Sequence, residues 1–79
     1  MYIVYIIKSK SRNWHYVGFT TNIKRRLKQH NLGKVRSTKP YRPFELKYTK
    51  EYSTSSEARK TEKYLKVGSN KEKHIKQFK

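Results

Sequence analysis

The amino-acid sequence predicts an α+β fold, in which a small three-stranded antiparallel sheet is flanked by helices in the order ββαβαα. Three observations lead to this prediction. Runs of β-branched and aromatic residues occur at positions 2–8, 14–19 and 44–52. Apolar residues at helical spacing follow several sets of capping residues, and a chain of 79 residues has room for only one thin core. We therefore expect a single domain over residues 1–79.

The two N-terminal strands are expected to pair as a hairpin, because the polar residues 9–13 between them are typical of a turn. The first strand has two apolar faces, formed by Tyr2, Val4 and Ile6 and by Ile3, Tyr5 and Ile7. A strand that is apolar on both faces is covered on both, so we expect it to be the central strand. The second strand ends near Gly18.

The first helix has three candidate N-caps, which are Thr20, Thr21 and Asn22. Its stripe at i, i+4 and i+7 consists of Ile23, Leu27 and His30. Gly33 is expected to end this helix, and an irregular basic loop then continues to Pro43. In the third strand, period-two alternation places on one face Phe44, Leu46, Tyr48 and Tyr52, with Lys50 interrupting.

The second helix is predicted from the capping box at residues 54–57. Its apolar stripe carries Ala58, Glu62 and Leu65, and Gly68 ends it. Another capping box, at residues 69–72, predicts a short last helix that contains Ile75 and Phe78.

Charge is the strongest compositional signal. Twenty-one Lys and Arg residues oppose five acidic ones, which gives a formal net charge of +16. Solubility needs a net charge of only about 2–8. The excess therefore favours binding to a polyanion, most commonly nucleic acid, over a charged surface that serves only solubility.

The sequence has no long basic amphipathic helix and no apolar run of about 20 residues, so we expect no membrane contact. Without cysteine the chain fits a reducing compartment, and we expect a cytoplasmic protein.

Missing residue types exclude several chemistries. Without cysteine there are no disulfides, zinc-thiolate sites or cysteine nucleophiles, and without aspartate there is no Ser-His-Asp triad. The acidic residues are Glu45, Glu51, Glu57, Glu62 and Glu72. Five carboxylates can hardly form the cluster that a two-metal nuclease needs. Any metal ion must therefore be bound by one or two glutamates, together with histidine, water or substrate phosphate.

Three features point to a site. Glu62 lies on an apolar helical stripe, where a carboxylate must be paired, protonated or bound to metal, unless it is a rim glutamate bridging to a lysine. Arg26 and His30 flank the stripe of the first helix, and an inward arginine needs an anion, either Glu62 or a substrate phosphate. Tyr5 and Tyr16 are central in the paired strands, where each is either a core aromatic or, near a cation, a base.

Together these positions resemble the GIY-YIG nucleases, over residues 2–78. That family carries two short motifs on a hairpin, an arginine on the first helix and a glutamate on a later helix. The motifs stand here as Ile3-Val4-Tyr5 and Tyr16-Val17-Gly18, and the stretches 20–31 and 56–66 look like the two helices. The chain is most similar to the short, free-standing single-domain members. Those are related to the nuclease domains of the excision-repair incision subunit and of an endonuclease that cuts branched DNA.

The resemblance implies a metal-dependent endonuclease that hydrolyses phosphodiester bonds, in DNA more than in RNA, either in repair or on particular structures. It gives catalytic roles to Tyr5, Tyr16, Arg26, His30 and Glu62. Glu62 would hold one Mg²⁺ or Mn²⁺ ion, Arg26 would grip the scissile phosphate, and Tyr16 would orient or deprotonate the attacking water. Tyr5 would be hydrogen-bonded alongside, and His30 would orient water or tyrosine. The loop cations expected to follow the nucleic-acid backbone are Lys34, Arg36, Lys39 and Arg42.

Two positions depart from the family pattern. Ile3 replaces a glycine of the first motif that is not a catalytic group, and Phe19 stands where some members have a lysine.

Two other functions stay open, since fold does not guarantee activity. One is a basic nucleic-acid-binding module of the same fold that no longer cuts, and the other is an unrelated basic protein such as a ribosome-associated RNA binder. Both would bind without metal-dependent turnover.

Overall fold

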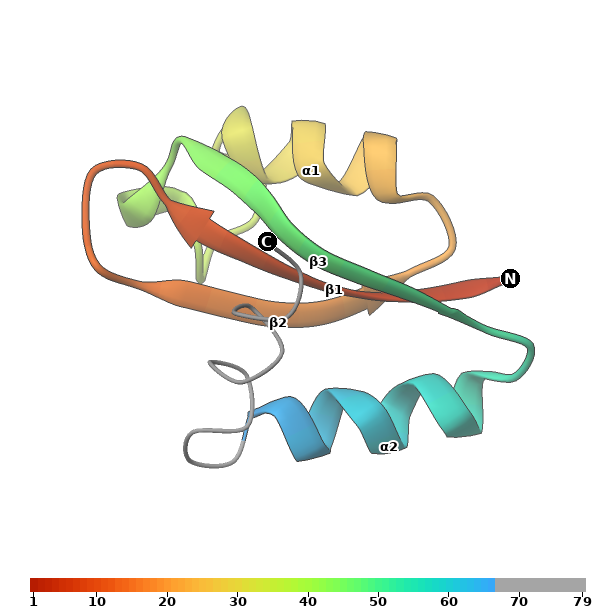
Figure 1. Cartoon of the computed structure of the whole chain (residues 1–79). Coiled ribbons are helices and arrows are strands. Elements are labelled where there is room, and N and C mark those ends of the chain that lie inside the picture. Colours follow the sequence, from red (N-terminus) through yellow and green to blue (C-terminus); the bar gives the residue numbers. More distant parts are fainter. Residues whose placement is uncertain (67–79) are drawn as a thin grey trace.

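A three-stranded antiparallel sheet organises the computed structural model, which describes residues 1–66 (Figure 1). Its strands are β1 (Tyr2–Ser9), β2 (His15–Thr20) and β3 (Phe44–Tyr52), in the spatial order β2-β1-β3. The prediction of a hairpin with a central first strand is therefore confirmed. The second strand begins at His15 rather than at Trp14.

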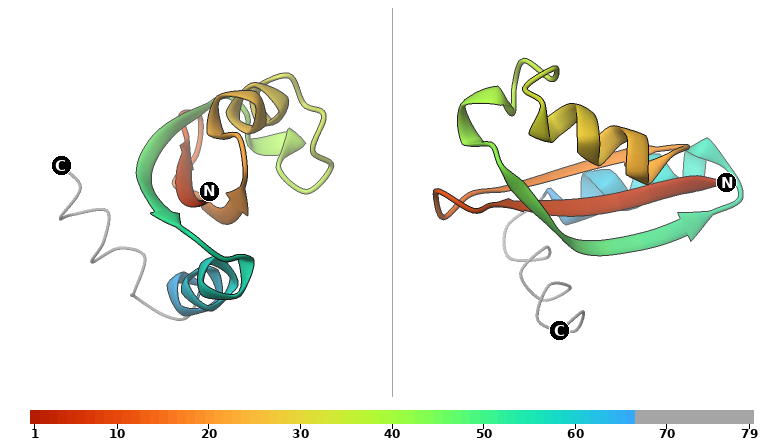
Figure 2. Two further views of the ribbon diagram at one scale, coloured as in Figure 1. Left: turned by 90° about the vertical axis from the view of Figure 1, so that its right-hand side faces the viewer. Right: turned by 90° about the horizontal axis from the view of Figure 1, so that it is seen from above.

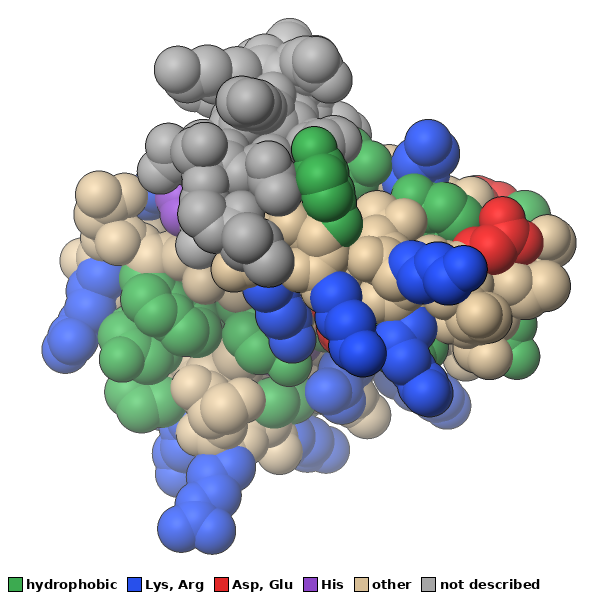
Figure 3. Space-filling view, turned by 90° about the horizontal axis from the view of Figure 1, so that it is seen from below, with side chains coloured by type: hydrophobic (Ala, Val, Ile, Leu, Met, Phe, Trp, Pro, Cys, Tyr) green, Lys and Arg blue, Asp and Glu red, His purple; other side chains and the backbone are tan. Residues whose placement is uncertain are grey.

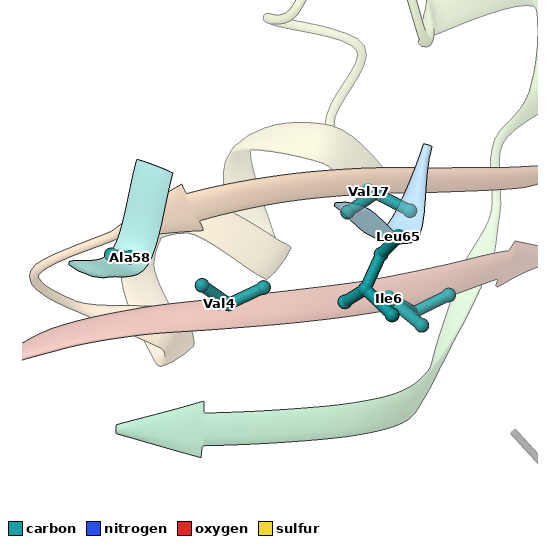
Figure 4. Packing of buried hydrophobic residues seen from close by; sticks show 5 residues of the cluster. All are labelled: Val4, Ile6, Val17, Ala58 and Leu65. Carbon is teal, nitrogen blue, oxygen red and sulfur yellow. The ribbon is translucent and has the colours of Figure 1, made fainter. Parts of the chain in front are cut away.

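Two helices cover opposite faces of this sheet, α1 (Ile23–Asn31) on one side and α2 (Ser55–Leu65) on the other (Figures 1 and 2). Between the sheet and α2, the buried cluster consists of Val4, Ile6, Val17, Ala58 and Leu65, and Figure 4 shows these side chains together. On the α1 side the buried cluster consists of Tyr5, Ile7 and Phe44, with Ile23 and Leu27 of α1 packed against it. The α+β prediction is confirmed, and the alternating apolar faces of β1 explain why one strand serves both cores.

Both helices begin at capping residues that the sequence singles out. Of the three candidates before α1, Asn22 is the N-cap, and its side-chain oxygen accepts a hydrogen bond from the Arg25 backbone N–H at 3.1 Å. Thr54 caps α2, since its hydroxyl accepts from the Glu57 N–H and donates to the Glu57 carboxylate. Gly33 follows the end of α1 with a φ of 78°, the left-handed conformation that glycine adopts without a Cβ clash.

The prediction that β3 keeps its apolar residues on one face is wrong. The register shifts between Ile6 and Ile7, so that Ile7 pairs with Leu46 while Ile6 pairs with Tyr48. The extra residue, Lys47, forms a bulge that moves the rest of the strand to the other face. Phe44 and Leu46 consequently pack on the α1 side, whereas Tyr48 and Tyr52 pack on the α2 side.

The loop from Gly33 to Pro43 is more regular than predicted, because it contains one turn of 3₁₀ helix, η1 (Lys39–Tyr41). It is tied to the hairpin through Ser9, whose hydroxyl donates to the Tyr41 carbonyl at 2.6 Å. The last predicted helix, with Ile75 and Phe78, lies outside the described residues. Within residues 1–66, neither helix has the length and apolar character that a membrane span requires.

Candidate active site

The site is centred on Tyr5, whose side chain is almost completely buried in the middle of β1. Tyr5 pairs across the hairpin with Gly18. A Cβ atom at position 18 would lie 2.7 Å from the Tyr5 hydroxyl oxygen and 3.0 Å from Cε2 of Tyr16. Gly18 is therefore required so that the Tyr5 phenol can lie across β2 and approach Tyr16.

His30 links Tyr5 to the basic loop. Its Nε2 lies 2.8 Å from the Tyr5 hydroxyl, and its Nδ1 lies 2.8 Å from the hydroxyl of Thr38. Tyr5, His30 and Thr38 are all buried, so this chain of hydrogen bonds is shielded from solvent. The sequence placed His30 on the helical stripe, and that position follows from the i, i+4, i+7 spacing.

Tyr16 completes an aromatic cluster with these two residues. Its ring centroid lies 6.4 Å from that of Tyr5 and 5.3 Å from that of His30. Tyr16 is only partly buried, whereas Tyr5 is buried. The hairpin and α1 thus bring together two phenols and an imidazole, and Tyr16 is the phenol that solvent can reach.

Arg26 stands beside the Tyr5 hydroxyl and is partly buried. Burial raises the pKa of Tyr5, while the nearby Arg26 guanidinium lowers it, and the net result is a pKa of about 12. Arg26 also donates from Nη1 to Oε1 of Gln29 at 3.2 Å. Tyr5 therefore keeps its proton at neutral pH, and the guanidinium is held near the site by its own helix.

The same environment keeps His30 neutral. Burial and, to a smaller extent, the positive charge of Arg26 lower the pKa of His30 to about 4. A neutral imidazole has one donor and one acceptor nitrogen, which matches its two hydrogen-bond partners.

We expect His30 to make stability depend on pH between about 4 and 6.5. Its pKa is about 4 in the folded protein and near 6.5 in the unfolded chain, so the unfolded state binds more protons in this window. The free energy of unfolding should rise with pH up to about 6.5, by at most about 3 kcal/mol from this group, and then level off. Urea unfolding at a series of pH values measures this rise.

The matched variant for this measurement is His30→Gln, which keeps hydrogen-bonding groups but does not titrate in the window. Its free energy of unfolding should vary less with pH than that of the unmodified protein. An identical pH dependence in both proteins would show that His30 is not buried as a neutral group.

Glu62 approaches the cluster from α2. Its side chain is 19% exposed, and its negative charge acts on Tyr5, raising the pKa of that phenol. Its ion-pair partner is Lys66 rather than Arg26, with 3.8 Å between Nζ and Oε2, and the same Nζ lies 6.0 Å from the ring centroid of Tyr16. The pair is loose and half-exposed on the lysine side, so it contributes little to stability and leaves the carboxylate oxygens available.

The donor set fits one hard cation held mostly by water. Residues 1–66 contain no group of three or more His, Cys, Asp or Glu side chains placed to bind a metal. Glu62 is the carboxylate whose charge acts on Tyr5. Mg²⁺ retains several waters and is often held by one or two carboxylates plus substrate phosphates, so a single glutamate is a sufficient protein ligand.

The predicted loop cations Lys34, Arg36, Lys39 and Arg42 are all exposed. Lys39 and Arg42 line an open pocket of about 410 Å³ together with Asn31, Pro40 and Pro43. Gly33 lies close to the Arg42 side chain, since a Cβ atom at position 33 would be 3.1 Å from Nη1 of Arg42. The loop thus presents positive charge at the end of α1 that carries His30.

Two features of this region were not predicted from the sequence. Thr38 hydrogen-bonds to His30, but it lies eight residues away in a loop without a repeating pattern, so no spacing rule identifies it. Trp14 stacks on Tyr41 with ring centroids 4.0 Å apart and an interplanar angle of 12°. An aromatic residue next to a strand is a weak signal, because core packing explains it equally well.

Comparison with known proteins identifies the architecture. The family model described as the GIY-YIG catalytic domain matches residues 1–76. The chain belongs to the GIY-YIG family. The motif residues Tyr5, Tyr16 and Gly18 are thus the ones that meet across the hairpin.

Within the GIY-YIG family, this chain is similar to several small UPF0213 proteins. It is 39% identical over 72 residues to the UPF0213 protein YazA of Bacillus subtilis, covering 90% of this chain and 72% of that one. A UPF0213 protein of Staphylococcus haemolyticus is 42% identical over 71 residues, with 89% and 85% covered. The solution NMR structure of a UPF0213 protein from Bacillus halodurans has a TM-score of 0.54 and 34% identity, covering 91% of this chain and 77% of that chain. The predicted resemblance to free-standing GIY-YIG members is confirmed.

Proposed function

We propose that this GIY-YIG domain is a metal-dependent endonuclease that hydrolyses phosphodiester bonds in nucleic acid, with DNA as the favoured substrate. The observation that carries the proposal is the meeting of Tyr5, Tyr16, Arg26 and His30 at one point that also feels the charge of Glu62. Hydrophobic packing alone does not explain why two phenols, an imidazole, a guanidinium and a carboxylate lie close together. General acid–base catalysis on a phosphate ester uses these groups.

The residues divide the work according to their surroundings. Glu62 would hold one Mg²⁺ or Mn²⁺ ion, which when bound would stabilise charge on the leaving oxygen. Arg26 would bind the scissile phosphate through its planar guanidinium. Tyr16, the more accessible phenol, would orient the attacking water and, in its phenolate form, accept the proton of that water. Tyr5 keeps its proton, and its pKa of about 12 suits a positioning role beside Tyr16 rather than that of a base at neutral pH.

Positive charge extends from this site in two directions. The loop carries its four exposed cations on the α1 side. On the opposite side, Lys and Arg side chains gather over α2 (Figure 3), whose exposed cations include Arg59, Lys60, Lys63 and Lys66. A polyanion that crosses the site would meet cations on both flanks, which supports contact with the backbone rather than with bases.

One assay tests the proposal. Purified protein is incubated with Mg²⁺ or Mn²⁺ and with labelled single-stranded, duplex and branched DNA and RNA, beside a Glu62→Gln control. We expect metal-dependent cleavage of a DNA substrate, with branched DNA favoured if the likeness to repair nucleases extends to substrate. Binding without cleavage of any substrate would instead assign the protein as a non-catalytic nucleic-acid-binding module.

Binding itself should depend steeply on salt because the net charge is +16. Log K on duplex DNA should fall with log salt concentration with a slope of about −0.9 for each phosphate neutralised. Arg36→Ala in the loop should reduce that slope by about one, whereas Lys50→Ala on β3 should change it less. Fluorescence anisotropy at several salt concentrations measures the slopes, and a flat salt dependence would point to a different kind of partner.

A further inference from the structure

Thr38 is the one residue of the loop 33–43 that is completely buried. The other residues of that loop are exposed or partly exposed, and four of them are cations. Burying a hydroxyl is unfavourable unless it forms hydrogen bonds. The Thr38 hydroxyl has two partners, Nδ1 of His30 at 2.8 Å and the Val35 carbonyl oxygen at 3.3 Å.

The positions of the protons follow from these contacts. A carbonyl oxygen only accepts, so the Thr38 hydroxyl donates to Val35. Its oxygen then accepts from Nδ1–H of His30, which leaves Nε2 as an acceptor. Nε2 in turn accepts the proton of the Tyr5 hydroxyl at 2.8 Å. Each proton in this arrangement has an acceptor.

The opposite tautomer fits less well. Nε2–H would donate to the Tyr5 oxygen. The Tyr5 proton would then need another acceptor, and among residues 1–66 no hydrogen bond from Tyr5 to one is seen. Thr38 would also have to leave the Val35 carbonyl in order to donate to Nδ1.

We propose that Thr38 is a positioning residue of the candidate active site, because its hydroxyl fixes His30 as the Nδ1–H tautomer and thereby directs the Tyr5 proton toward His30. The lone pairs of the Tyr5 oxygen then stay available to a donor such as Arg26, whose positive charge lowers the pKa of this phenol. The hydrogen-bond assignment stands independently of the nuclease activity. Only its effect on cleavage rests on the proposed function.

The same residue joins the loop to the site. Thr38 directly precedes η1, and its backbone carbonyl accepts from the Tyr41 N–H at 3.0 Å. Lys39 and Arg42, the cations that line the loop pocket, therefore lie one and four residues from the hydroxyl that orients His30. A nucleic-acid backbone held by this loop would be held by the segment that sets the orientation of the catalytic cluster.

The tautomer of His30 is measured directly by ¹⁵N NMR on protein labelled at histidine, where the protonated and unprotonated ring nitrogens have different shifts. His30→Gln assigns the His30 signals among the three histidines. We expect Nδ1–H in the unmodified protein near neutral pH. Detection of Nε2–H in the folded, unmodified protein would overturn the proposal without any need for a Thr38 variant.

Two variants test the role of the hydroxyl. Thr38→Val is nearly isosteric but has no acceptor for Nδ1–H, so the population should shift toward Nε2–H and the cleavage rate should fall by about tenfold or more with little change in KM. Thr38→Ser keeps the hydroxyl and should restore both the tautomer and the rate. If valine prevents folding, Thr38→Ala, which removes the hydroxyl without adding bulk, replaces it in the same comparison.

The two readouts separate the two proposals. An Nδ1–H tautomer that persists in the valine or alanine variant would overturn the role of Thr38 whatever the activity. A tautomer that follows the hydroxyl, in a protein that cleaves no substrate, would keep the role of Thr38 and remove the nuclease assignment.

Discussion

Replacing Glu62 by glutamine is expected to abolish metal-dependent cleavage while the protein stays folded. Glutamine keeps the size and hydrogen-bonding capacity of the side chain but removes the charge that a divalent cation needs. A bound metal contributes several kcal/mol of transition-state stabilisation, so the rate should fall by about 10³-fold or more. No second carboxylate replaces it, since residues 1–66 hold no cluster of metal-binding side chains.

Stability and binding should respond differently from activity. The ion pair with Lys66 spans 3.8 Å at a half-exposed lysine, so its loss should cost less than about 1 kcal/mol. Nucleic-acid binding should be unchanged or tighter, because one negative charge leaves the phosphate site. Thermal melts, binding curves and cleavage assays on the same preparation measure the three quantities.

Glu57→Gln is the matched control. It removes the same charge from the same helix, but Glu57 lies in the first turn, where it accepts a hydrogen bond from the Thr54 hydroxyl at 3.0 Å. It should lower stability slightly and leave cleavage intact. Full activity in Glu62→Gln would end the assignment of Glu62 as the metal ligand, and the family membership would then carry information on fold alone.

Tyr16→Phe should lower cleavage by about 10²-fold or more, the low end for the loss of a general base. The ring would still pack against Tyr5, His30 and Trp14, whose centroids lie 6.4, 5.3 and 6.2 Å away, so the fold and nucleic-acid binding should be retained. Single-turnover cleavage with saturating protein separates this chemical defect from any change in binding.

Tyr2→Phe provides the comparison, because Tyr2 lies at the start of β1 and packs on the α2 side of the sheet. It removes a phenol hydroxyl outside the aromatic cluster and should leave the rate unchanged. A folded Tyr16→Phe protein with the original rate would remove this hydroxyl from the mechanism.

Local rules were sufficient to predict most of the architecture. The two apolar faces of the first strand predicted its central place, and the candidate caps included Asn22 and Thr54. Helical spacing also placed His30 toward the sheet. These features depend on neighbours within about four residues, which a sequence shows directly.

What could not be predicted depends on contacts between distant segments. The bulge at Lys47 lets β3 supply apolar side chains to two cores, and a lysine in the strand does not indicate a bulge. The burial of Thr38 requires the loop to fold back on α1. The sequence left open whether Glu62 pairs with a lysine or with Arg26. In the structure its partner is Lys66, one helical turn further along α2. This ion pair does not decide whether Glu62 is a structural residue or a metal ligand.

The stacking of Trp14 on Tyr41 gives the protein an intrinsic optical probe. Trp14 is the sole tryptophan of the chain, and its partner belongs to η1, in the loop that carries the cations. Its indole fluorescence therefore reports on the junction between the hairpin turn and that loop. Arg12 lies on the same junction, with its guanidinium carbon 5.5 Å from the centroid of the Tyr41 ring. Docking of the loop can thus be followed by emission in real time, without a label.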